Sequence, residues 1–588
     1  MRIIFRNANL RWILLLSWLV VGNTVMAASR ANPESATGLQ RPDAVIAKRM
    51  LVVTAHPHAT QVGYQVLQRG GSAADAAVAI QAALTLVEPQ SSGIGGGAFM
   101  LYWDADKQQL LTYDGRETAP GTATSELFVG DDGKPMRWVD ALVGGRSVGV
   151  PGVLRMLELA HQQQGVLPWS ELFDGAVELA RQGFEVTPRL QQLLEQEMNP
   201  GIKRYSQARD YFYPSGQPLQ AGDKLANPQL AQTLQKIAEQ GADYLYSGEL
   251  AQRLVDRVHG ASDNPGLLQL EDLADYQAKV RQPLCQPFRQ YQVCGMPPPT
   301  SGGVTVLQIL AMMEHQGLPD LEPQGIDFAH RFSQASRLAY ADRGRYLADS
   351  DFVNVPVRQL LDRDYLRQRA KLIDPQLDMG SASPGQFDNV AYADDESPEL
   401  PSTSHFVVVD SRGNAVSMTT SIEMAFGSTL MVDGFLLNNQ LTDFSFVAER
   451  DGQLIANRVE PGKRPRSSMS PMMVFDQQGR LVLLTGSPGG SRIINYVAQM
   501  LLQTLVWGMD PQQVVTLPHI SNRNGVTELE LDSQAPEQVK ALQAGLEQRG
   551  HTVKVTAMNS GIHAIMRNRD GSWRSAVDPR REGLALGQ

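Results

Sequence analysis

The spacing of apolar residues changes along this chain, and the change limits the folds that the chain can adopt. Between about residues 150 and 280 the apolar positions recur at helical intervals, as in 154–161 and 230–240. Beyond residue 403 they alternate at every second position, which is typical of strands with one buried face. Separate helix-rich and strand-rich parts predict an α+β protein whose helices and sheets pack in layers.

Three hairpins are predicted in the strand-rich part, each with a polar turn between two alternating segments. They join 404–410 to 415–420, 472–476 to 481–485, and 562–566 to 573–577. Helices are predicted for 72–87, where Ser72 and Asp75 form a capping box, and for 304–316, 326–346 and 492–507. We therefore expect a four-layer αββα sandwich, with additional helical segments in the part that precedes residue 403.

The composition is that of a globular protein. Hydrophobic residues make up 42% of the 588 positions and charged residues 19%, which excludes disorder of the whole chain. The net charge is −10 and no long basic run occurs, so nucleic acid is not expected as a partner.

The N-terminus has the features of an export signal. Arg2, Arg6 and Arg11 precede the apolar stretch 12–21, and small residues follow at 25–28. The apolar stretch is too short to span a bilayer, although an uncleaved anchor stays an alternative. We expect residues 1–27 to be a signal peptide and the mature protein to be periplasmic or secreted, without a membrane segment.

Two close pairs of residues, one of cysteines and one of histidines, bear on disulfide and metal chemistry. Cys285 and Cys294, nine positions apart, are either a disulfide or two small residues in adjacent strands. His56 and His58 are a close pair without a third ligand nearby, no His-Glu-x-x-His motif occurs, and the glycines of 93–97 lack a following Gly-Lys-Ser/Thr. No metal site and no cofactor are therefore expected.

The junction at residue 403 has the features of a catalytic nucleophile. An acidic segment with few apolar residues, 381–402, is expected to be exposed and ends at Ser402, and Thr403 then opens a predicted core strand. If the Ser402–Thr403 bond is cut, Thr403 gains a free α-amine with a pKa of about 7.7–8.0. This amine can accept the proton of its own residue's hydroxyl, so that no histidine base is required.

Several motifs resemble those of γ-glutamyltranspeptidases, in the order in which that family has them. They are Ser92–Gly97, Arg116–Pro120, Met296–Gly303, Ala341–Arg343, Thr403–Asp410, Leu436–Gln440 with Asp443, Arg464–Pro471 and Thr485–Arg492. The resemblance implies an N-terminal nucleophile hydrolase that cuts itself. The large subunit would be 28–402, with 381–402 as its exposed processing tail, and the small catalytic subunit would be 403–588.

The resemblance also implies roles for individual residues. Thr403 would be the nucleophile, Ser421 its hydrogen-bond partner, and the Gly489 and Gly490 amides the oxyanion donors; the two glycines precede a predicted helix, whose positive end favours an anion. The residues implied for substrate binding are Arg116, Ser467 and Ser468 for the α-carboxylate, and Gln440, Asp443 and Glu423 for the α-ammonium. Glu423 stands where many members carry Asn, and 444–461 is short where some members carry a lid.

The activity implied is γ-glutamyl transfer and glutathione hydrolysis. Thr403 would form a γ-glutamyl ester, which passes to water, an amino acid or a peptide. One alternative is a related acylase for glutaryl or other acyl amides, which Glu423 favours and Asp443 opposes. A second is a protein that binds γ-glutamyl compounds without turnover, which the intact Thr403, Gly489 and Gly490 oppose.

Overall fold

A computed structural model describes residues 42–388, 390–395, 397, 402–532 and 535–588, with the Ser402–Thr403 bond intact. The predicted signal peptide, 1–27, lies outside these residues, as does part of the predicted processing tail. Among the described residues, no helix is both long enough and apolar enough to cross a membrane.

Two sheets, each of seven strands among the described residues, form the centre of the molecule. The first has the order β23 (Leu584–Gly587), β2 (Leu51–Thr54), β10 (Ser404–Val409), β11 (Ala415–Ser421), β3 (Gly97–Asp104), β4 (Gln109–Gly115) and β7 (Lys279–Arg281). The second has the order β1 (Ile46–Ala47), β22 (Trp573–Val577), β21 (His563–Arg567), β17 (Leu481–Gly486), β16 (Met472–Phe475), β9 (Tyr291–Gly295) and β8 (Leu284–Phe288). The three predicted hairpins are confirmed as β10–β11, β16–β17 and β21–β22, all antiparallel.

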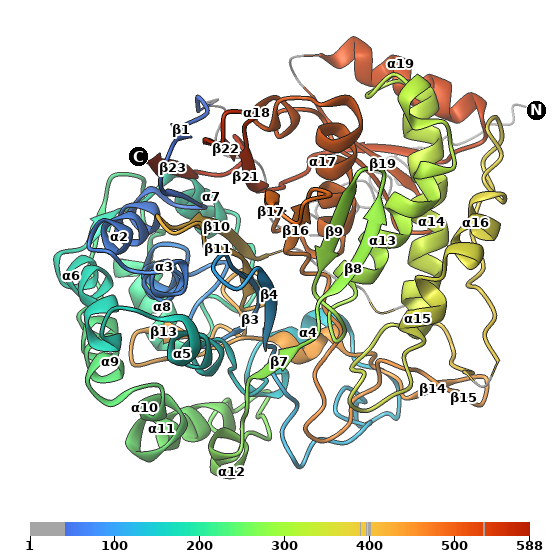
Figure 1. Cartoon of the computed structure of the whole chain (residues 1–588). Coiled ribbons are helices and arrows are strands. Elements are labelled where there is room, and N and C mark those ends of the chain that lie inside the picture. The colour runs from blue at the N-terminus through green and yellow to red at the C-terminus, as the bar shows by residue number, and fades with distance from the viewer. Residues whose placement is uncertain (1–41, 389, 396, 398–401, 533–534) are drawn as a thin grey trace, which may run out of the picture.

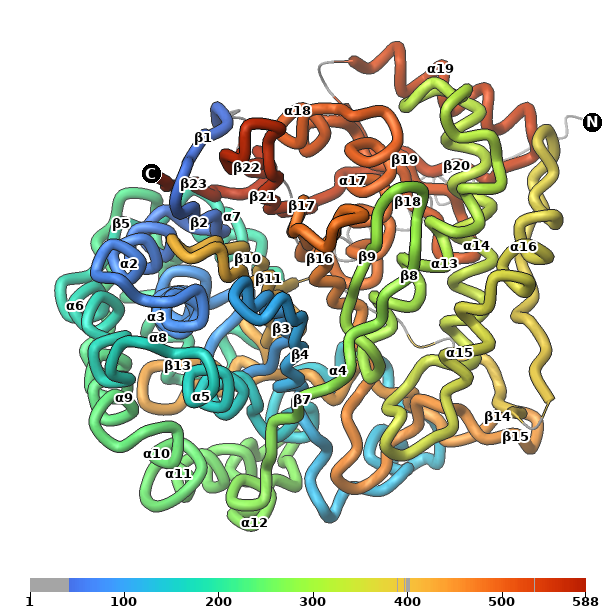
Figure 2. The backbone as a smooth tube through the Cα atoms, in the orientation of Figure 1, coloured from blue at the N-terminus to red at the C-terminus, as the bar shows by residue number. Residues whose placement is uncertain are grey.

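Helices cover the outer face of each sheet, as Figures 1 and 2 show. Those over the first sheet include α2 (Pro57–Gln68), α3 (Ala73–Val87), α5 (Val153–Gln164), α6 (Asp174–Gln182) and α9 (Pro228–Gln240). On the second sheet α13 (Gly302–Glu314) and α17 (Ile493–Trp507) contact the strands, and α14 (Ile326–Tyr346), α16 (Arg363–Ala370) and α19 (Pro536–Gln548) pack around these helices. The αββα prediction is confirmed, and so are the four helices predicted individually.

Shorter elements complete the chain. The helices are α4 (Trp138–Leu142), α7 (Pro188–Glu195), α8 (Ser206–Phe212), α10 (Asp243–Tyr246), α11 (Gly248–His259), α12 (Leu270–Ala274), α15 (Val357–Leu360) and α18 (Pro511–Val514). The strands are β5 (Phe184–Glu185), β6 (Lys224–Leu225), β12 (Met431–Val432), β13 (Phe435–Leu436), β14 (Glu449–Arg450), β15 (Gln453–Leu454), β18 (Ile520–Asn522), β19 (Thr527–Glu530) and β20 (Val553–Thr556). The 3-10 turns η1 (Gly145–Ser147), η5 (Gln440–Asp443) and η6 (Gly490–Arg492) adjoin the site or its motifs.

The core between the two sheets is apolar and continuous. It includes Leu51, Val53, Leu101, Val407, Val409, Met473, Leu484 and Ile565, all buried. On the outer face of the first sheet, every residue of α3 is buried. The small side chains of this Ala-rich helix let it lie close to the strands, and the predicted capping box of Ser72 and Asp75 begins it.

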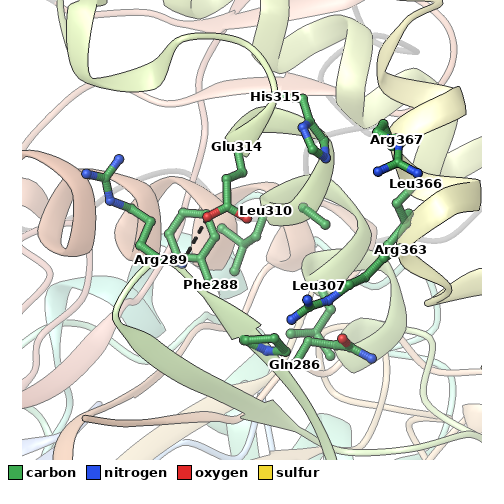
Figure 3. A pocket seen from close by; sticks show the side chains of 12 residues that line it. Gln286, Phe288, Arg289, Leu307, Leu310, Glu314, His315, Arg363, Leu366 and Arg367 are labelled. Atoms are coloured by element: carbon green, nitrogen blue, oxygen red, sulfur yellow. Dashed lines mark hydrogen bonds between the residues drawn. The ribbon is translucent and has the colours of Figure 1, made fainter. Parts of the chain in front are cut away.

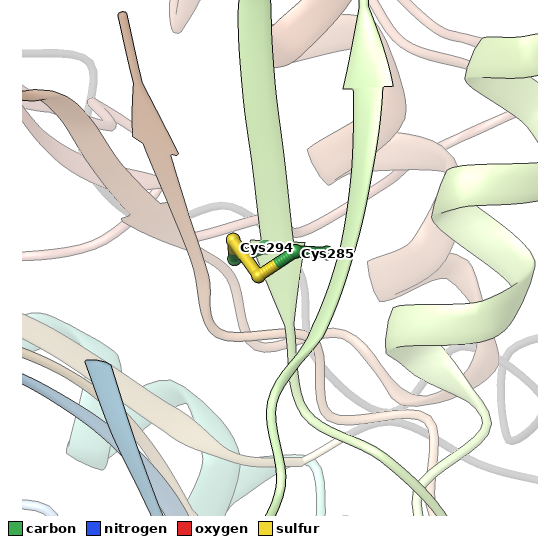
Figure 4. The surroundings of a disulfide bond; sticks show 2 residues. All are labelled: Cys285 and Cys294. Atoms are coloured by element: carbon green, nitrogen blue, oxygen red, sulfur yellow. A yellow bond between two sulfur atoms is a disulfide. The ribbon is translucent and has the colours of Figure 1, made fainter. Parts of the chain in front are cut away.

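The two cysteines form a disulfide, which decides between the two interpretations left open by the sequence. Cys285 on β8 and Cys294 on β9 are directly opposite each other in the antiparallel register, and their sulfur atoms are bonded (Figure 4). The bond therefore joins two strands that already pair at the edge of the second sheet.

The described part of the predicted processing tail is exposed at some residues, such as Ser381, Ser383 and Gln386, and buried at others. Gly385 and Ala393 are buried, and the Asp395 side chain has no exposed area because it contacts Arg466 and Asn457. The acidic composition predicted solvation, but the carboxylate of Asp395 meets cationic and amide partners that are distant in the sequence. Asp394 likewise forms an ion pair with Arg345.

Buried histidines make the stability of this fold depend on pH. Burial lowers the pKa of His563 from 6.5 to about 4 and that of His551 to about 3. Burial also holds the pKa of His405 and of His519 well below 6.5. Below about pH 6.5 the unfolded chain binds protons that the folded chain does not. The contribution of these histidines to stability is therefore complete above that pH and decreases as the pH falls toward 4.

We predict that replacing one of these histidines weakens the pH dependence. The Tm of the protein should fall between pH 7 and pH 5, and His563→Gln should show a smaller fall than the unsubstituted protein. The group removed contributes up to about 1.4 kcal/mol per pH unit in that range. Thermal unfolding of both proteins at pH 7, 6 and 5 measures this. Equal falls in Tm would contradict the assignment.

Candidate active site

The predicted junction lies at the start of β10, against the end of α3. Ser404 donates a hydrogen bond from Oγ to Oε2 of Glu88 at 2.7 Å, and Ser402 donates from Oγ to the Gln90 carbonyl at 2.9 Å. Ser92 and Ser404 are also joined through their hydroxyls at 3.1 Å. The residues on both sides of Thr403 are thus fixed by the segment 88–92, and the junction is buried in the intact chain.

The Thr403 hydroxyl lies against the peptide bond that precedes it. It contacts the Ser402 carbonyl oxygen and is 3.3 Å from Oγ of Ser421. Ser421, at the end of β11, donates from Oγ to the same carbonyl oxygen at 3.0 Å. A donor on this oxygen polarises the carbonyl toward attack, and it would stabilise the negative charge that develops there.

Arg116 provides a buried cation next to the nucleophile. It follows β4 and has no exposed area. Its Nε donates to the Pro465 carbonyl at 3.1 Å, and Nη2 donates to the Arg466 carbonyl at 2.9 Å and to Oδ2 of Asp443 at 2.5 Å. Nη1 has no hydrogen-bond partner among the described residues. A buried guanidinium nitrogen in this condition can donate a hydrogen bond to a ligand carboxylate.

Asp443 and Gln440 supply acceptors on the turn η5. Gln440 donates from Nε2 to Oδ2 of Asp443 at 2.7 Å, the oxygen that Arg116 also contacts. The amide oxygen Oε1 of Gln440 is buried without a partner among the described residues. An ammonium group is a donor that fits an amide oxygen and a carboxylate side by side.

The remaining predicted binding residues lie in the same pocket. Ser468 accepts a hydrogen bond at Oγ from Nη2 of Arg343 at 2.7 Å, and Ser467 accepts one at Oγ from the Met469 amide at 3.1 Å. Glu423 has a φ of +76°, a conformation that non-glycine residues rarely adopt, and its amide donates to Oγ of Ser421 at 2.9 Å. This backbone conformation points to a constraint at the site.

Gly489 and Gly490 lie at the entrance to η6 and α17, as the sequence predicted. Their φ angles are +132° and +58°, and a Cβ at Gly489 would be 2.7 Å from the Tyr496 ring. Only glycine fits there without a shift. Gly490 lines the pocket together with the nucleophile, whereas Gly489 is not among the lining residues.

One pocket therefore contains all but one of the predicted site residues. Its lining includes Arg116, Ser402, Thr403, Ser421, Glu423, Gln440, Asp443, Ser467, Ser468 and Gly490. The contacts that hold these residues in place include groups to which the sequence patterns assigned no role. Arg343 belongs to a motif that is visible in the sequence. Its contact with Ser468, however, joins residues 125 positions apart, and no local pattern predicts it.

Glu117 is a second residue that sequence patterns missed. Burial raises the pKa of its carboxyl from 4.5 to about 8, although Arg116 opposes the shift with Nη1 3.7 Å from Oε2. The carboxyl is therefore largely uncharged at neutral pH. The cation of Arg116 is then balanced by Asp443 and stays available to an anionic ligand.

Other sequence features do not assemble a second catalytic centre. Residues 145–149 match a Gly-x-Ser-x-Gly pattern, but Ser147 is fully buried on η1 and donates from Oγ to the Leu142 carbonyl at 2.8 Å. His56 and His58 stack on each other, and no group of three possible metal ligands occurs within the described ranges. A hollow between β8, α13 and α16 is lined by Arg289, His315, Arg363, Arg367, Glu314 and apolar side chains, and contains none of the predicted site residues (Figure 3).

The fold and the site together define the class of this protein. Two stacked sheets between helical layers, with a threonine that opens a central strand, are the arrangement of N-terminal nucleophile hydrolases. The cephalosporin acylase of Bacillus halodurans has this structure with a TM-score of 0.81 and 26% identity, over 95% of this chain and 99% of its own.

Sequence comparison specifies the family. The sequence model of γ-glutamyltranspeptidases matches residues 59–588. The glutathione hydrolase proenzyme of Bacillus subtilis (strain 168) is 35% identical over 99% of both chains. That of Escherichia coli (strain K12) is 36% identical over 91% of both. The chain belongs to the γ-glutamyltranspeptidase family, and it is an enzyme of that type.

Proposed function

We propose that this enzyme is a γ-glutamyl transferase and glutathione hydrolase that cuts itself between Ser402 and Thr403. The observation that carries the proposal is the pairing of Arg116 with Asp443 and Gln440 beside the Thr403 hydroxyl. A buried cation with an unused nitrogen and a neighbouring pair of acceptors suit the α-carboxylate and the α-ammonium of a glutamyl group. The γ-carbonyl of such a group then extends toward the nucleophile.

Self-cleavage begins from the contact between the Thr403 hydroxyl and the Ser402 carbonyl. Thr403 Oγ attacks the carbonyl carbon through a five-membered ring, and Ser421 stabilises the oxyanion. The C–N bond breaks, the nitrogen takes up the hydroxyl proton, and an ester joins Ser402 to Thr403 Oγ. Water hydrolyses this ester, which leaves a carboxylate on Ser402 and a free α-amine on Thr403. The products are the large subunit, 28–402, and the small subunit, 403–588.

The mature enzyme uses the same hydroxyl on its substrate. The α-amine of Thr403 takes the hydroxyl proton as Oγ attacks the γ-carbonyl, and the amides of Gly489 and Gly490 stabilise the oxyanion. The amine product leaves with that proton, and a γ-glutamyl ester remains on Thr403. Water, an amino acid or a peptide then attacks the ester and regenerates the hydroxyl.

The first prediction from the proposed function concerns the nucleophile. Thr403→Ala should stay a single chain and lose at least about 10³-fold in kcat, because both the attacking oxygen and the new amine depend on this residue. Thr403→Ser, which keeps a hydroxyl, should still be cut. Denaturing electrophoresis and N-terminal sequencing measure this, and the smaller product should begin Thr-Ser-His-Phe. A full-length polypeptide that hydrolyses glutathione would contradict the mechanism.

The second prediction concerns Ser421. Ser421→Ala removes the donor to the scissile carbonyl and should slow self-cleavage about 10- to 10³-fold, as loss of one oxyanion donor does. Ser421→Thr keeps the hydroxyl and should process at close to the normal rate. The fraction of uncut chain is followed over time after purification. Equal processing rates for the Ala and Thr variants would exclude this role.

A related acylase for glutaryl or other acyl amides is the second candidate function. Glu423 lines the pocket where many family members carry Asn, and the Bacillus halodurans structure that resembles this fold is a cephalosporin acylase. A glutaryl group lacks the α-ammonium, so the carboxylate of Asp443 would have no ligand charge to pair with. The buried Asp443–Gln440 acceptors therefore favour the γ-glutamyl donor.

The third prediction separates these two activities. Asp443→Asn should lower kcat/KM for γ-glutamyl anilide about 10²-fold or more and that for glutaryl anilide by a smaller factor, since both substrates depend on Arg116 but only the first carries an ammonium. Glu423→Asn is the matched variant, because it replaces the other carboxylate that lines the pocket by an amide. If the unsubstituted enzyme prefers the glutaryl anilide, the acylase function replaces the one proposed.

Export is proposed from the N-terminal sequence. Arg2, Arg6 and Arg11 with the apolar stretch 12–21 support a signal peptide that ends at about residue 27, and a periplasmic or secreted enzyme. The disulfide between Cys285 and Cys294 agrees with an oxidising compartment. A binding protein without turnover is disfavoured, because the sequence retains Thr403, Gly489 and Gly490.

A further inference from the structure

A hollow of about 360 Å³ lies between β8, α13 and α16 and is separate from the nucleophile pocket (Figure 3). The two spaces have no lining residue in common. Small-molecule sites in proteins have volumes of about 300–1,000 Å³. The hollow therefore has the size that a compact organic molecule requires.

Contacts within the fold hold the walls of this hollow. The β8–β9 hairpin forms one wall, and the disulfide between Cys285 and Cys294 joins its two strands. The turn of the hairpin is attached to the end of α13, because the Arg289 amide donates to Oε1 of Glu314 at 3.0 Å. The opposite wall is α16, which packs against α13. A ligand would thus enter a space whose walls are already in place, and little binding energy would be lost in ordering them.

The floor of the hollow is apolar. Leu307 and Leu310 of α13 and Leu366 of α16 form it, and all three are buried. The half-buried Ala311 lies beside them on α13, and the exposed Pro287 adds apolar surface on the side of β8. An apolar part of a ligand would be removed from water against this floor.

The polar side chains around the floor are mainly cationic. They are those of Arg289, Arg363, Arg367 and His315, and the lining includes only one carboxylate, that of Glu314. Because the whole chain has a net charge of −10, this is a local excess of positive charge. The carboxylate of Glu314 accepts from the hairpin turn, whereas Arg363 and Arg367 lie on the other side of the hollow (Figure 3). The side formed by α16 is therefore the one that would attract an anion.

Arg363 is the cation best placed to bind that anion. It is the first residue of α16 and is exposed, and Figure 3 shows its side chain extending from the helix toward the centre of the hollow. Among the described residues, no carboxylate pairs with its guanidinium. Arg367 does form an ion pair, with Asp364, but that carboxylate is 72% exposed. An exposed pair of this kind contributes little, so Arg367 can also contact a ligand.

We propose that this hollow binds a small organic anion, with the apolar body of the anion on the leucine floor and its charged group at Arg363. An aromatic or aliphatic carboxylate or sulfonate has this chemistry. A long acidic peptide fits less well, because the cations surround one small apolar floor and do not follow an extended surface. This site does not depend on the proposed function.

The first measurement compares two fluorescent probes with the same rings. The probe 8-anilinonaphthalene-1-sulfonate is an anion, and N-phenyl-1-naphthylamine lacks the sulfonate. Arg363→Gln should raise Kd for the sulfonate about 2- to 5-fold, the size expected for one exposed charge contact, and leave Kd for the amine unchanged. Ala311→Met should raise both constants, because the larger side chain fills part of the hollow. Fluorescence titration of the purified enzyme measures each Kd.

Arg181→Gln is the control. Arg181 lies in the last turn of α6, over the first sheet, and is exposed, so the same charge is removed far from the hollow. Its Kd for the sulfonate should equal that of the unsubstituted enzyme. An unchanged Kd in Arg363→Gln would overturn the inference, because the probe would then bind elsewhere. Equal rises for the two probes in that variant would overturn it as well.

A second measurement tests the class of ligand. Hexanoate should displace the sulfonate probe at a severalfold lower concentration than hexanamide, which has the same chain without the charge. Hexaglutamate, an acidic peptide without an apolar body, should be a weaker competitor than hexanoate. Stronger displacement by hexaglutamate would overturn the inference and indicate a surface for an acidic peptide. None of these titrations requires turnover at Thr403, so a failure of the proposed function would leave their outcome unchanged.

Discussion

The ion pair between Arg116 and Asp443 is the contact on which the organisation of this site depends. Both groups are largely withdrawn from water, and removing two charges from water is costly unless each is well paired. Here the pairing is incomplete, because Nη1 of Arg116 has no hydrogen-bond partner among the described residues. The fold thus keeps an ion pair whose cation is only partly hydrogen-bonded. A zwitterionic ligand would complete the pairing, with its carboxylate at Arg116 and its ammonium at Asp443.

The same pair joins the two parts of the chain that the proposed cut would separate. Each central sheet combines strands from both parts: β2, β3, β4 and β7 precede residue 403, and β10, β11 and β23 follow it. In the second sheet β1, β8 and β9 precede it, and the other strands follow it. Since strands from the two parts are hydrogen-bonded neighbours within one core, breaking a single peptide bond leaves the core contacts in place. A cut between Ser402 and Thr403 would therefore leave the folded core in place.

Local patterns predicted the elements better than their assembly. The alternation in 404–420 was enough for the β10–β11 hairpin, and the capping box was enough for the start of α3. No local pattern could place β10 between β2 and β11, or bring Arg116 to Asp443 across 327 positions. These residues were identified through resemblance to a family. The burial of Asp395 was missed for the same reason, because its partners Arg466 and Asn457 are distant in sequence.

Glu117 shows why the charge balance of the site cannot be read from residue types alone. Arg116 is next to Glu117 in the sequence and close to Asp443 in the fold. If both carboxyls were ionised, the site would carry an excess of negative charge. Burial raises the Glu117 pKa to about 8, so near neutral pH only Asp443 carries the opposing charge. An ionised Glu117 would pair with Nη1, which lies 3.7 Å from its Oε2 and has no hydrogen-bond partner among the described residues. The depth of one carboxyl in the fold therefore keeps the guanidinium available to an anionic ligand.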